Sequence, residues 1–212
     1  MTDATDDALG IRKLGHRNFV GGDGDLWQRI GMLQFEFLRA RGLEPRHVLL
    51  DFACGSLRAG VHFIPYLDAG NYLGFDKSVD LVIMGVVHEL GHDRFIEQRP
   101  QFVLNGRFDL SEFDRNPDFA IAQSIFTHLT PADIRRSLAA IAAIAAPHTQ
   151  LFATFFRRNF EHENPTESHS RLCFYYSAEE MRSFGEASGW KFEDIGAWDH
   201  PRGQMMGRYF RA

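Results

Sequence analysis

The sequence has few of the features that mark secreted, membrane or nucleic-acid-binding proteins. Only two of its 212 residues are cysteine, Cys54 and Cys173, which excludes a disulfide framework and favours a reducing, cytoplasmic compartment. The longest smooth apolar run, residues 138–146, is too short to cross a bilayer, and the acidic N-terminus does not resemble a signal peptide. Lysine and arginine form no long run, and the formal net charge is −5. We therefore expect neither a nucleic-acid nor a membrane partner.

The composition is otherwise that of a globular protein, with 44% hydrophobic and 24% charged residues. A chain of this length predicts one domain over residues 1–212. We expect residues 1–42 to form an N-terminal arm and a helix, and residues 43–212 to form the core. The arm contains Phe19, Gly21 and Gly22 and is followed by Trp27, a combination of glycine hinges and aromatic side chains that is typical of a lid.

Apolar runs alternate with helical patterns along the core. Strands are predicted over residues 47–52, 71–76, 101–105, 118–123, 151–156, 190–198 and 204–211. Helices are predicted over residues 25–42, 58–67, 78–91, 130–146 and 177–189, with Ser78, Thr130 and Ser177 as N-caps. This order predicts an α/β fold of Rossmann-like type: a seven-stranded, mostly parallel sheet with helices on both faces and a C-terminal antiparallel hairpin.

The first predicted strand ends in D-F-A-C-G-S-L-R, residues 51–58. Its small residues permit a ligand to approach the backbone closely. Asp76 ends the next strand, 21 positions beyond Gly55, where an acidic side chain can accept hydrogen bonds from ribose hydroxyls. A dinucleotide cradle needs G-x-G-x-x-G, but the corresponding residues are Ala53, Gly55 and Arg58. These residues favour an adenosine cofactor that lacks phosphates, such as S-adenosylmethionine.

Several motifs in order resemble those of the class I S-adenosylmethionine-dependent methyltransferases. V-L-L-D-F-A-C-G-S-L-R is similar to their first motif, D-x-G-x-G-x-G, with Ala53 and Leu57 where glycine is usual. Y-L-G-F-D-K resembles the acidic second motif, and F-V-L-N-G-R-F-D-L the segment of the third strand beside the adenine. D-F-A-I-A-Q-S-I-F-T-H-L and H-T-Q-L-F-A-T-F-F resemble the fourth and fifth strands. The resemblance covers about residues 45–156.

This resemblance implies roles for the residues that match the motifs. The first loop, formed by Asp51, Phe52, Ala53, Cys54 and Gly55, is expected to face the methionine part of S-adenosylmethionine, and Asp76 to hold the ribose. Lys77, Phe108 and Asp109 are expected near the adenine, and Gln123 and Ser124 beside the methionine or the methyl group.

His128 follows the fourth strand and is the predicted general base, although a helix-start or packing role is an alternative. Residues 157–176 are the predicted acceptor loop. Arg157 and Arg158 could hold an acceptor carboxylate or phosphate, and His162 and His169 are reserve bases. The glutamates of the loop leave an assisting metal open, but no metal ligand is predicted.

The stretch V-V-H-E-L-G-H-D, residues 86–93, contains the zinc-binding pattern H-E-x-x-H. A metzincin would continue with glycine at position 95 and histidine at position 98, where this chain has Phe95 and Gln98. Gly91 is typical of a helix end, and histidines are favourable near that end of the helix dipole. We therefore interpret the stretch as the end of a supporting helix.

Three functional hypotheses follow from these patterns. The first is methyl transfer to a small-molecule acceptor, most simply a hydroxyl oxygen. Nucleic-acid amino-group methylation is disfavoured, because Q-S-I-F replaces the N/D-P-P-Y/F motif at residues 123–126. The alternatives are a module that binds S-adenosylmethionine without transferring its methyl group, and a zinc hydrolase built on H-E-L-G-H.

Overall fold

The structure, a computed structural model, describes residues 4–22 and 24–211. The chain divides into two compact units, a first one over Asp3–Arg107 and a second one whose main part is Phe108–Ala212. The predicted arm covers residues 1–24, of which residues 1–3 and Asp23 lie outside the described residues. No helix in the described part of the chain is long and apolar enough to span a membrane.

The first unit is built on three parallel strands, β1 (Leu49–Phe52), β2 (Tyr72–Asp76) and β3 (Gln101–Leu104), in the order β3-β2-β1. Every residue of β1 and β2 is buried, which explains why both strands are continuous apolar runs rather than alternating patterns. The register pairs Phe52 with Phe75, and their rings stack with centroids 4.8 Å apart. The carboxyl ends of β1 and β2 are therefore adjacent.

The helices of this unit include the three predicted ones, over 25–42, 58–67 and 78–91, and further helices that were not predicted, in the arm and after Gly91. They are α1 (Ala4–Leu14), α2 (His16–Phe19), α3 (Leu26–Ala40), α4 (Gly60–Tyr66), α5 (Val79–Met84), the π-helix η1 (Gly85–Leu90) and α6 (His92–Gln98). The arm thus contains two helices. The helix expected over 78–91 begins as predicted, because the Ser78 side chain accepts a hydrogen bond from the Leu81 amide, but it widens into a π-helix at Gly85.

The second unit contains the strands β4 (Phe119–Ala122), β5 (Gln150–Arg157), β6 (Tyr175–Tyr176), β7 (Lys191–Ala197) and β8 (Met205–Phe210). Their order is β4-β5-β8-β7, with the two-residue β6 beside β5. β4 and β5 are parallel, whereas β8 pairs antiparallel with both β5 and β7. The predicted antiparallel hairpin is confirmed, and β6 is one strand more than the seven expected.

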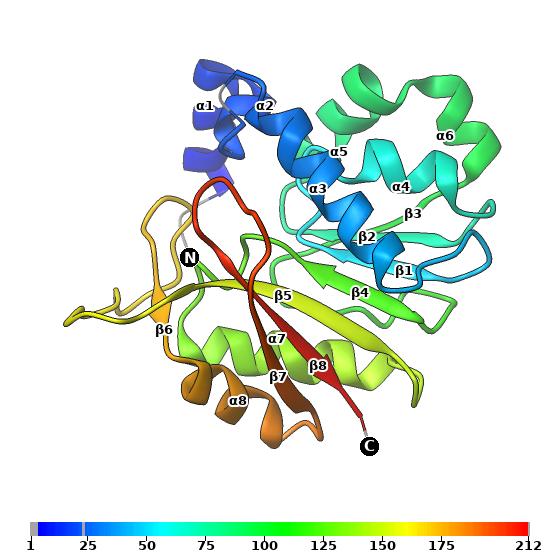
Figure 1. The fold of residues 1–212 in the computed structure, drawn as a ribbon. Helices are drawn as coiled ribbons and strands as arrows, with labels where there is room; N and C mark the ends of the chain where they lie inside the picture. The colour runs from blue at the N-terminus through cyan, green and yellow to red at the C-terminus, as the bar shows by residue number, and fades with distance from the viewer. Residues whose placement is uncertain (1–3, 23, 212) are drawn as a thin grey trace. The chain divides into compact units, whose positions relative to one another are not determined.

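Two helices, α7 (Pro131–Ile144) and α8 (Ala178–Glu186), pack together beside the strands of the second unit (Figure 1). Both N-caps are as predicted, and Ser177 forms a complete capping box with Glu180. Trp190 Nε1 donates to the Leu138 carbonyl at 3.0 Å, and the Tyr209 hydroxyl donates to the Met181 carbonyl at 2.7 Å. These bonds fix both helices to the hairpin. The predicted fold class, a mostly parallel α/β fold closed by an antiparallel hairpin, is confirmed.

Candidate functional site

In the loop after β1, every second residue from 53 to 57 has a left-handed backbone conformation. Ala53, Gly55 and Leu57 have φ values of 66°, 54° and 61°. These are the three positions at which the first methyltransferase motif usually has glycine, which adopts such values without strain. Ala53 was expected to be tolerated and Leu57 to alter the loop path, but both residues adopt the left-handed conformation that glycine would provide.

The two substitutions for glycine differ in their energetic balance. A left-handed conformation costs a residue with a Cβ atom roughly 1–2 kcal/mol. Leu57 is fully buried, and burying a leucine side chain contributes roughly 1.5–3 kcal/mol, so its strain is offset. Ala53 is partly exposed and its methyl group is too small for a comparable gain. The strain of this loop therefore resides mainly at Ala53.

Close helix packing fixes the path of the loop. A Cβ atom on Gly85 would lie 2.6 Å from the Ser56 carbonyl carbon and 2.7 Å from its oxygen, and one on Gly31 would collide with the Arg58 carbonyl oxygen. The backbones of α3 and of the π-helix can therefore approach residues 56–58 only because Gly31 and Gly85 lack side chains.

Asp76 connects this loop to the end of β2. Its Oδ2 accepts a hydrogen bond from the Gly55 amide at 2.8 Å, and its Oδ1 accepts one from the Ser78 amide at 2.8 Å. Burial raises the pKa of Asp76, although these backbone amides act in the opposite direction. The Lys77 amide also forms a hydrogen bond with this carboxylate. A carboxylate has about four acceptor directions, so Asp76 can accept one further hydrogen bond, as a ribose hydroxyl would donate.

A second buried acid lies within β1. Burial raises the pKa of Asp51 from 3.8 to about 6, although the Tyr72 hydroxyl, which donates to Asp51 Oδ2 at 2.7 Å, lowers it. Burial, together with the charges of Asp76 and Asp51, also raises the pKa of the Cys54 thiol. Cys54 is thus a neutral, buried side chain. Tyr72 was not predicted as part of this group, and no local pattern distinguishes it from a core aromatic residue.

The other residues assigned to the cofactor lie in different surroundings. Phe52 is fully buried in the core of the first unit, and Lys77 is exposed directly after β2. Phe108 and Asp109 belong to the second unit. The backbone of Phe108 has the left-handed conformation, with φ 60°. The Arg136 guanidinium lies 5.5 Å from the centroid of the Phe108 ring. Asp109 Oδ1 accepts hydrogen bonds from the amide and the hydroxyl of Ser111.

Gln123 and Ser124 belong to a buried polar network at the carboxyl end of β4. The Ser124 amide donates to Thr154 Oγ1 at 2.7 Å, and Gln123 Nε2 donates to Ser124 Oγ at 2.7 Å. The same nitrogen lies 3.1 Å from His200 Nε2, and Gln204 Nε2 donates to Ser124 Oγ at 2.8 Å. Gln123, His200 and Gln204 are all less than 10% exposed. These side chains hold one another in a defined arrangement.

No functional role was predicted for His200, which lies between the last two predicted strands, or for Gln204, the first residue of the last predicted strand. Their location could have been inferred from the topology of the sheet. Because β8 runs antiparallel to β5, the register pairs Phe155 near the end of β5 with Met205 at the start of β8. The loop before β8 must then lie at the carboxyl end of β5, where ligands bind in open α/β sheets.

His128 has the geometry of a neutral base. Its Nδ1 lies 2.9 Å from the Leu172 carbonyl oxygen, which can only accept, so Nδ1 carries the proton and Nε2 has a free lone pair. Burial is the main cause that lowers the pKa of His128 below 6.5, and neighbouring His169 and Arg202 act in the same direction. The side chain is therefore uncharged at neutral pH.

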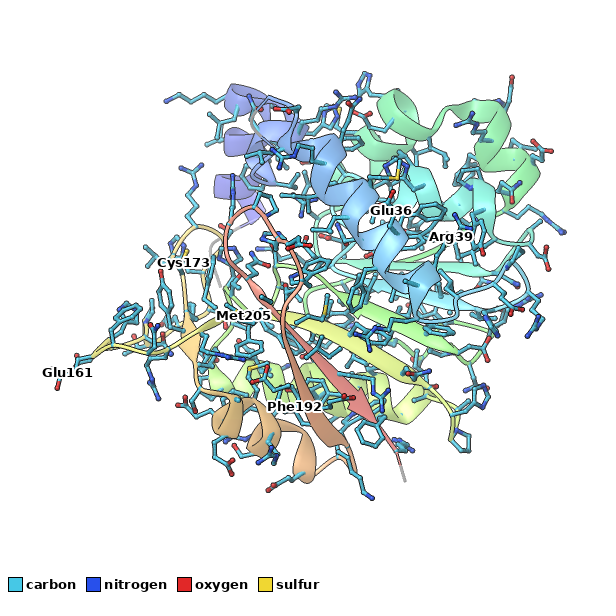
Figure 2. The ribbon with its side chains drawn as sticks, viewed as in Figure 1. Glu36, Arg39, Glu161, Cys173, Phe192 and Met205 are labelled. Atoms are coloured by element: carbon cyan, nitrogen blue, oxygen red, sulfur yellow. The ribbon has the colours of Figure 1, made fainter. Side chains whose placement is uncertain are left out.

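The predicted acceptor loop lies between β5 and β6, and Figure 2 shows Glu161 at its far end. His169 Nδ1 accepts from the amides of Arg171 and Leu172, so the proton of the neutral ring is on Nε2. His162 packs edge-to-face on Tyr175, with ring centroids 4.7 Å apart.

Both arginines at the start of this loop form ion pairs. Arg157 Nη2 lies 2.6 Å from Asp194 Oδ1, and Arg158 Nη2 lies 2.7 Å from Glu180 Oε2. Binding of an acceptor anion by either guanidinium would have to use its remaining donors.

The H-E-x-x-H residues do not share one helix face. Gly91, with φ 85°, ends the π-helix at Leu90 as predicted, and His92 begins α6. The His88 ring stacks on His16, whereas His92 is exposed beside Asp93. Glu89 forms an ion pair with Arg17. No group of three or more His, Cys, Asp or Glu side chains within the described residues is arranged to hold a metal ion.

No protein-family description matches the chain. Solved structures do match it along most or all of its length. Magnesium protoporphyrin IX methyltransferase from Synechocystis PCC 6803 with bound S-adenosylhomocysteine has a TM-score of 0.70 and 15% identity, covering 99% of this chain and 100% of that one. The fold is that of the class I methyltransferases.

Two further structures support the same fold. Human N-acetylserotonin methyltransferase in complex with S-adenosylmethionine has a TM-score of 0.67 and 11% identity, covering 95% of this chain and 57% of that chain. A methyltransferase of calicheamicin biosynthesis in its S-adenosylhomocysteine-bound form has a TM-score of 0.61 and 14% identity, covering 86% of this chain and 54% of that chain. The methyltransferase fold inferred from the ordered motifs is therefore confirmed.

Proposed function

We propose that the protein transfers the methyl group of S-adenosylmethionine to a small-molecule acceptor, most simply to a hydroxyl oxygen. The observation that carries the proposal is the loop after β1. Its left-handed residues at 53, 55 and 57 reproduce the backbone of a glycine motif in a chain that has only one of the three glycines. Its Gly55 amide is bonded to the acid at the end of β2. A strained conformation that persists without glycine is typical of a functional site.

The residues of the first unit fit this cofactor. Asp76 would hold a ribose hydroxyl through its remaining acceptor direction, and the small residues 53–55 would allow the methionine part to approach the backbone. When bound, S-adenosylmethionine supplies an electrophilic methyl group on a sulfonium. A cofactor without phosphates needs no further glycines in this loop, which is consistent with Leu57 and Arg58 after Ser56.

We assign the general-base role to His128. A hydroxyl acceptor must lose its proton when its oxygen is methylated, and a neutral imidazole with a free Nε2 lone pair can take that proton. The reduced pKa of His128 keeps the base unprotonated at neutral pH. Gln123 and Ser124, held by the polar network with His200 and Gln204, would orient the reacting groups.

A small acceptor is favoured by the net charge of −5 and by two of the similar structures, whose names refer to magnesium protoporphyrin IX and N-acetylserotonin. Residues 157–176 are the proposed acceptor loop. Because Arg157 and Arg158 already pair with carboxylates, a neutral hydroxyl compound fits this loop better than a strongly anionic one.

The proposal is tested by following labelled methyl transfer from S-adenosylmethionine to a panel of hydroxyl compounds, each matched to the amine of the same skeleton. The expected result is transfer to hydroxyl members that is lost in Asp76→Asn. Transfer only to amines would overturn the oxygen assignment. Stoichiometric cofactor binding without transfer to any acceptor would support the alternative, a non-catalytic binding module, which is favoured by the departures from the glycine motif at Ala53 and Leu57.

A further inference from the structure

The carboxylate of Glu89 binds two side chains from the N-terminal arm. Arg17 donates from Nε to Oε1 and from Nη2 to Oε2, both at 2.6 Å, and His16 Nε2 lies 2.6 Å from Oε1. Only 6% of the Glu89 side chain is exposed. Although burial raises the pKa of Glu89, the hydrogen bonds and charges of Arg17 and His16 lower it below its ordinary value. A two-point guanidinium–carboxylate pair is among the stronger side-chain contacts.

Both partners of Glu89 belong to a short segment that we call the strap, residues 16–22. Glycines in the left-handed conformation lie just before it (Gly15, φ 78°), near its end (Gly21, φ 75°) and beyond it (Gly24, φ 58°). Within the strap, the amides of Val20, Gly21 and Gly22 donate to carbonyl groups of residues 16–18. The strap is thus internally bonded, and glycines in the left-handed conformation lie at either side of it.

The strap lies against the loop that carries the proposed cofactor residues. The Val20 carbonyl accepts a hydrogen bond from Arg58 Nη1 at 3.0 Å. Val20 Cγ1 is also 3.4 Å from the position that a Cβ atom on Gly55 would occupy. Gly22 packs on Trp27 so closely that a Cβ atom would lie 2.6 Å from that of Trp27, and the Arg17 guanidinium lies 4.6 Å from the Trp27 ring centroid.

We propose that Glu89 is a positioning residue that holds the strap over the cofactor loop and thereby sets the rate of cofactor exchange. The inference rests on the proposed function, because it takes residues 53–55 and Asp76 as the cofactor site. It gives the H-E-L-G-H stretch a role without a metal: its glutamate anchors the segment that covers the loop.

Loss of the Glu89 contact should change the kinetics of cofactor binding more than its equilibrium. Weakening the Glu89 contact makes the strap leave the loop more often, whether or not a cofactor is bound. Association and dissociation then accelerate by the same factor, and the equilibrium constant changes little. General damage to the binding site would instead weaken the equilibrium affinity.

The test compares wild type with Glu89→Gln and Arg17→Gln. Glu97→Gln, on the exposed part of α6, is the matched control. Association and dissociation rates of S-adenosylhomocysteine are measured by surface plasmon resonance, and amide hydrogen exchange of residues 16–22 is measured in the protein without ligand. We expect both rates to rise about tenfold, the effect of losing roughly one charge-assisted contact, with faster exchange of the strap amides.

Unchanged rates and unchanged strap exchange in Glu89→Gln would overturn the inference. So would a weaker equilibrium affinity with an unchanged association rate, because that pattern indicates damage to the site. Arg17→Gln guards against misfolding, since the Arg17 side chain is 45% exposed. If wild type itself does not bind S-adenosylhomocysteine, the proposed function fails, and the inference about cofactor exchange falls with it. The ligand-free hydrogen exchange still reports separately whether Glu89 holds the strap.

Discussion

The Gly55 amide donates a hydrogen bond to Asp76 Oδ2 over 2.8 Å, joining residues that are 21 positions apart in the chain. The bond connects the loop after β1 to the carboxyl end of the neighbouring strand. It makes the first motif and the acidic residue one structural unit, so that a change in either is expected to alter the other.

Ala53→Gly should stabilise the protein. Glycine removes the left-handed strain at φ 66° while adding some freedom to the unfolded chain, so the net gain is expected to be about 0.5–1 kcal/mol. Urea denaturation measures the change. Leu57→Gly should have the opposite sign, since it also removes a fully buried side chain. If both variants change stability in the same direction, the two positions do not differ as we infer.

Asp51→Asn should make stability less dependent on pH. The pKa of Asp51 is about 6 in the folded protein against 3.8 ordinarily. The stability that this group contributes is therefore fully present below pH 3.8 and is lost as pH rises through 6. Each pKa unit corresponds to about 1.4 kcal/mol. The free energy of unfolding of the variant, relative to that of wild type, should consequently rise by on the order of 3 kcal/mol between pH 4 and pH 7.5.

Unfolding free energies at these two pH values test this prediction. Asp76 is present in both proteins, so the comparison reports the titration of Asp51 together with its charge coupling to Asp76. A difference between variant and wild type that stays constant with pH would contradict the assignment of a buried, proton-binding Asp51.

Gly85→Ala should displace the loop after β1. The added methyl group would lie within 2.7 Å of the Ser56 backbone, and backbone atoms cannot move aside as a flexible side chain can. We expect a loss of about 1–3 kcal/mol of stability, as overpacked sites typically show, together with weaker binding of S-adenosylhomocysteine. Gly106→Ala is the control, since a Cβ atom there meets nothing within 4 Å. Equal stability and equal S-adenosylhomocysteine affinity of the two variants would argue against the packing role of Gly85.

His128→Gln should reduce methyl transfer by roughly 10²–10⁴-fold, the range for loss of a general base, with little change in S-adenosylhomocysteine binding. Because burial lowers the pKa of His128 below 6.5, the wild-type rate should decline only on the acid side of that value. Nitrogen NMR of the imidazole should find the proton on Nδ1. A protonated Nε2 in the neutral ring would exclude the base assignment.

Local features of the fold could be predicted from the sequence. Ser78, Thr130 and Ser177 are N-caps because each side chain accepts from an amide three residues later, a requirement that short motifs encode. The buried parallel strands were also identifiable, since β1 and β2 have apolar runs followed by small or acidic residues. These features depend on neighbours within a few positions.

Features that depend on distant contacts could not be predicted in the same way. Glu89 meets Arg17 across 72 positions, and His200 meets Gln123 across 77. Nothing near either residue specifies its partner. The two-residue β6 exists only through its pairing with β5, and the π-helix begins where Gly85 meets a loop almost thirty residues earlier. The five-residue zinc pattern was misleading for the same reason: its glutamate is used by the arm.

Calorimetric titration of S-adenosylhomocysteine into wild type, Asp76→Asn and Asp80→Asn tests the central claim most directly. Asp80 lies on the exposed first turn of α5 and serves as the control. The account predicts one binding site in wild type and in Asp80→Asn, and at least about tenfold weaker binding in Asp76→Asn, since a neutral amide oxygen cannot serve both backbone amides and the ribose. No binding to wild type at millimolar concentration, or equal binding to all three proteins, would contradict it.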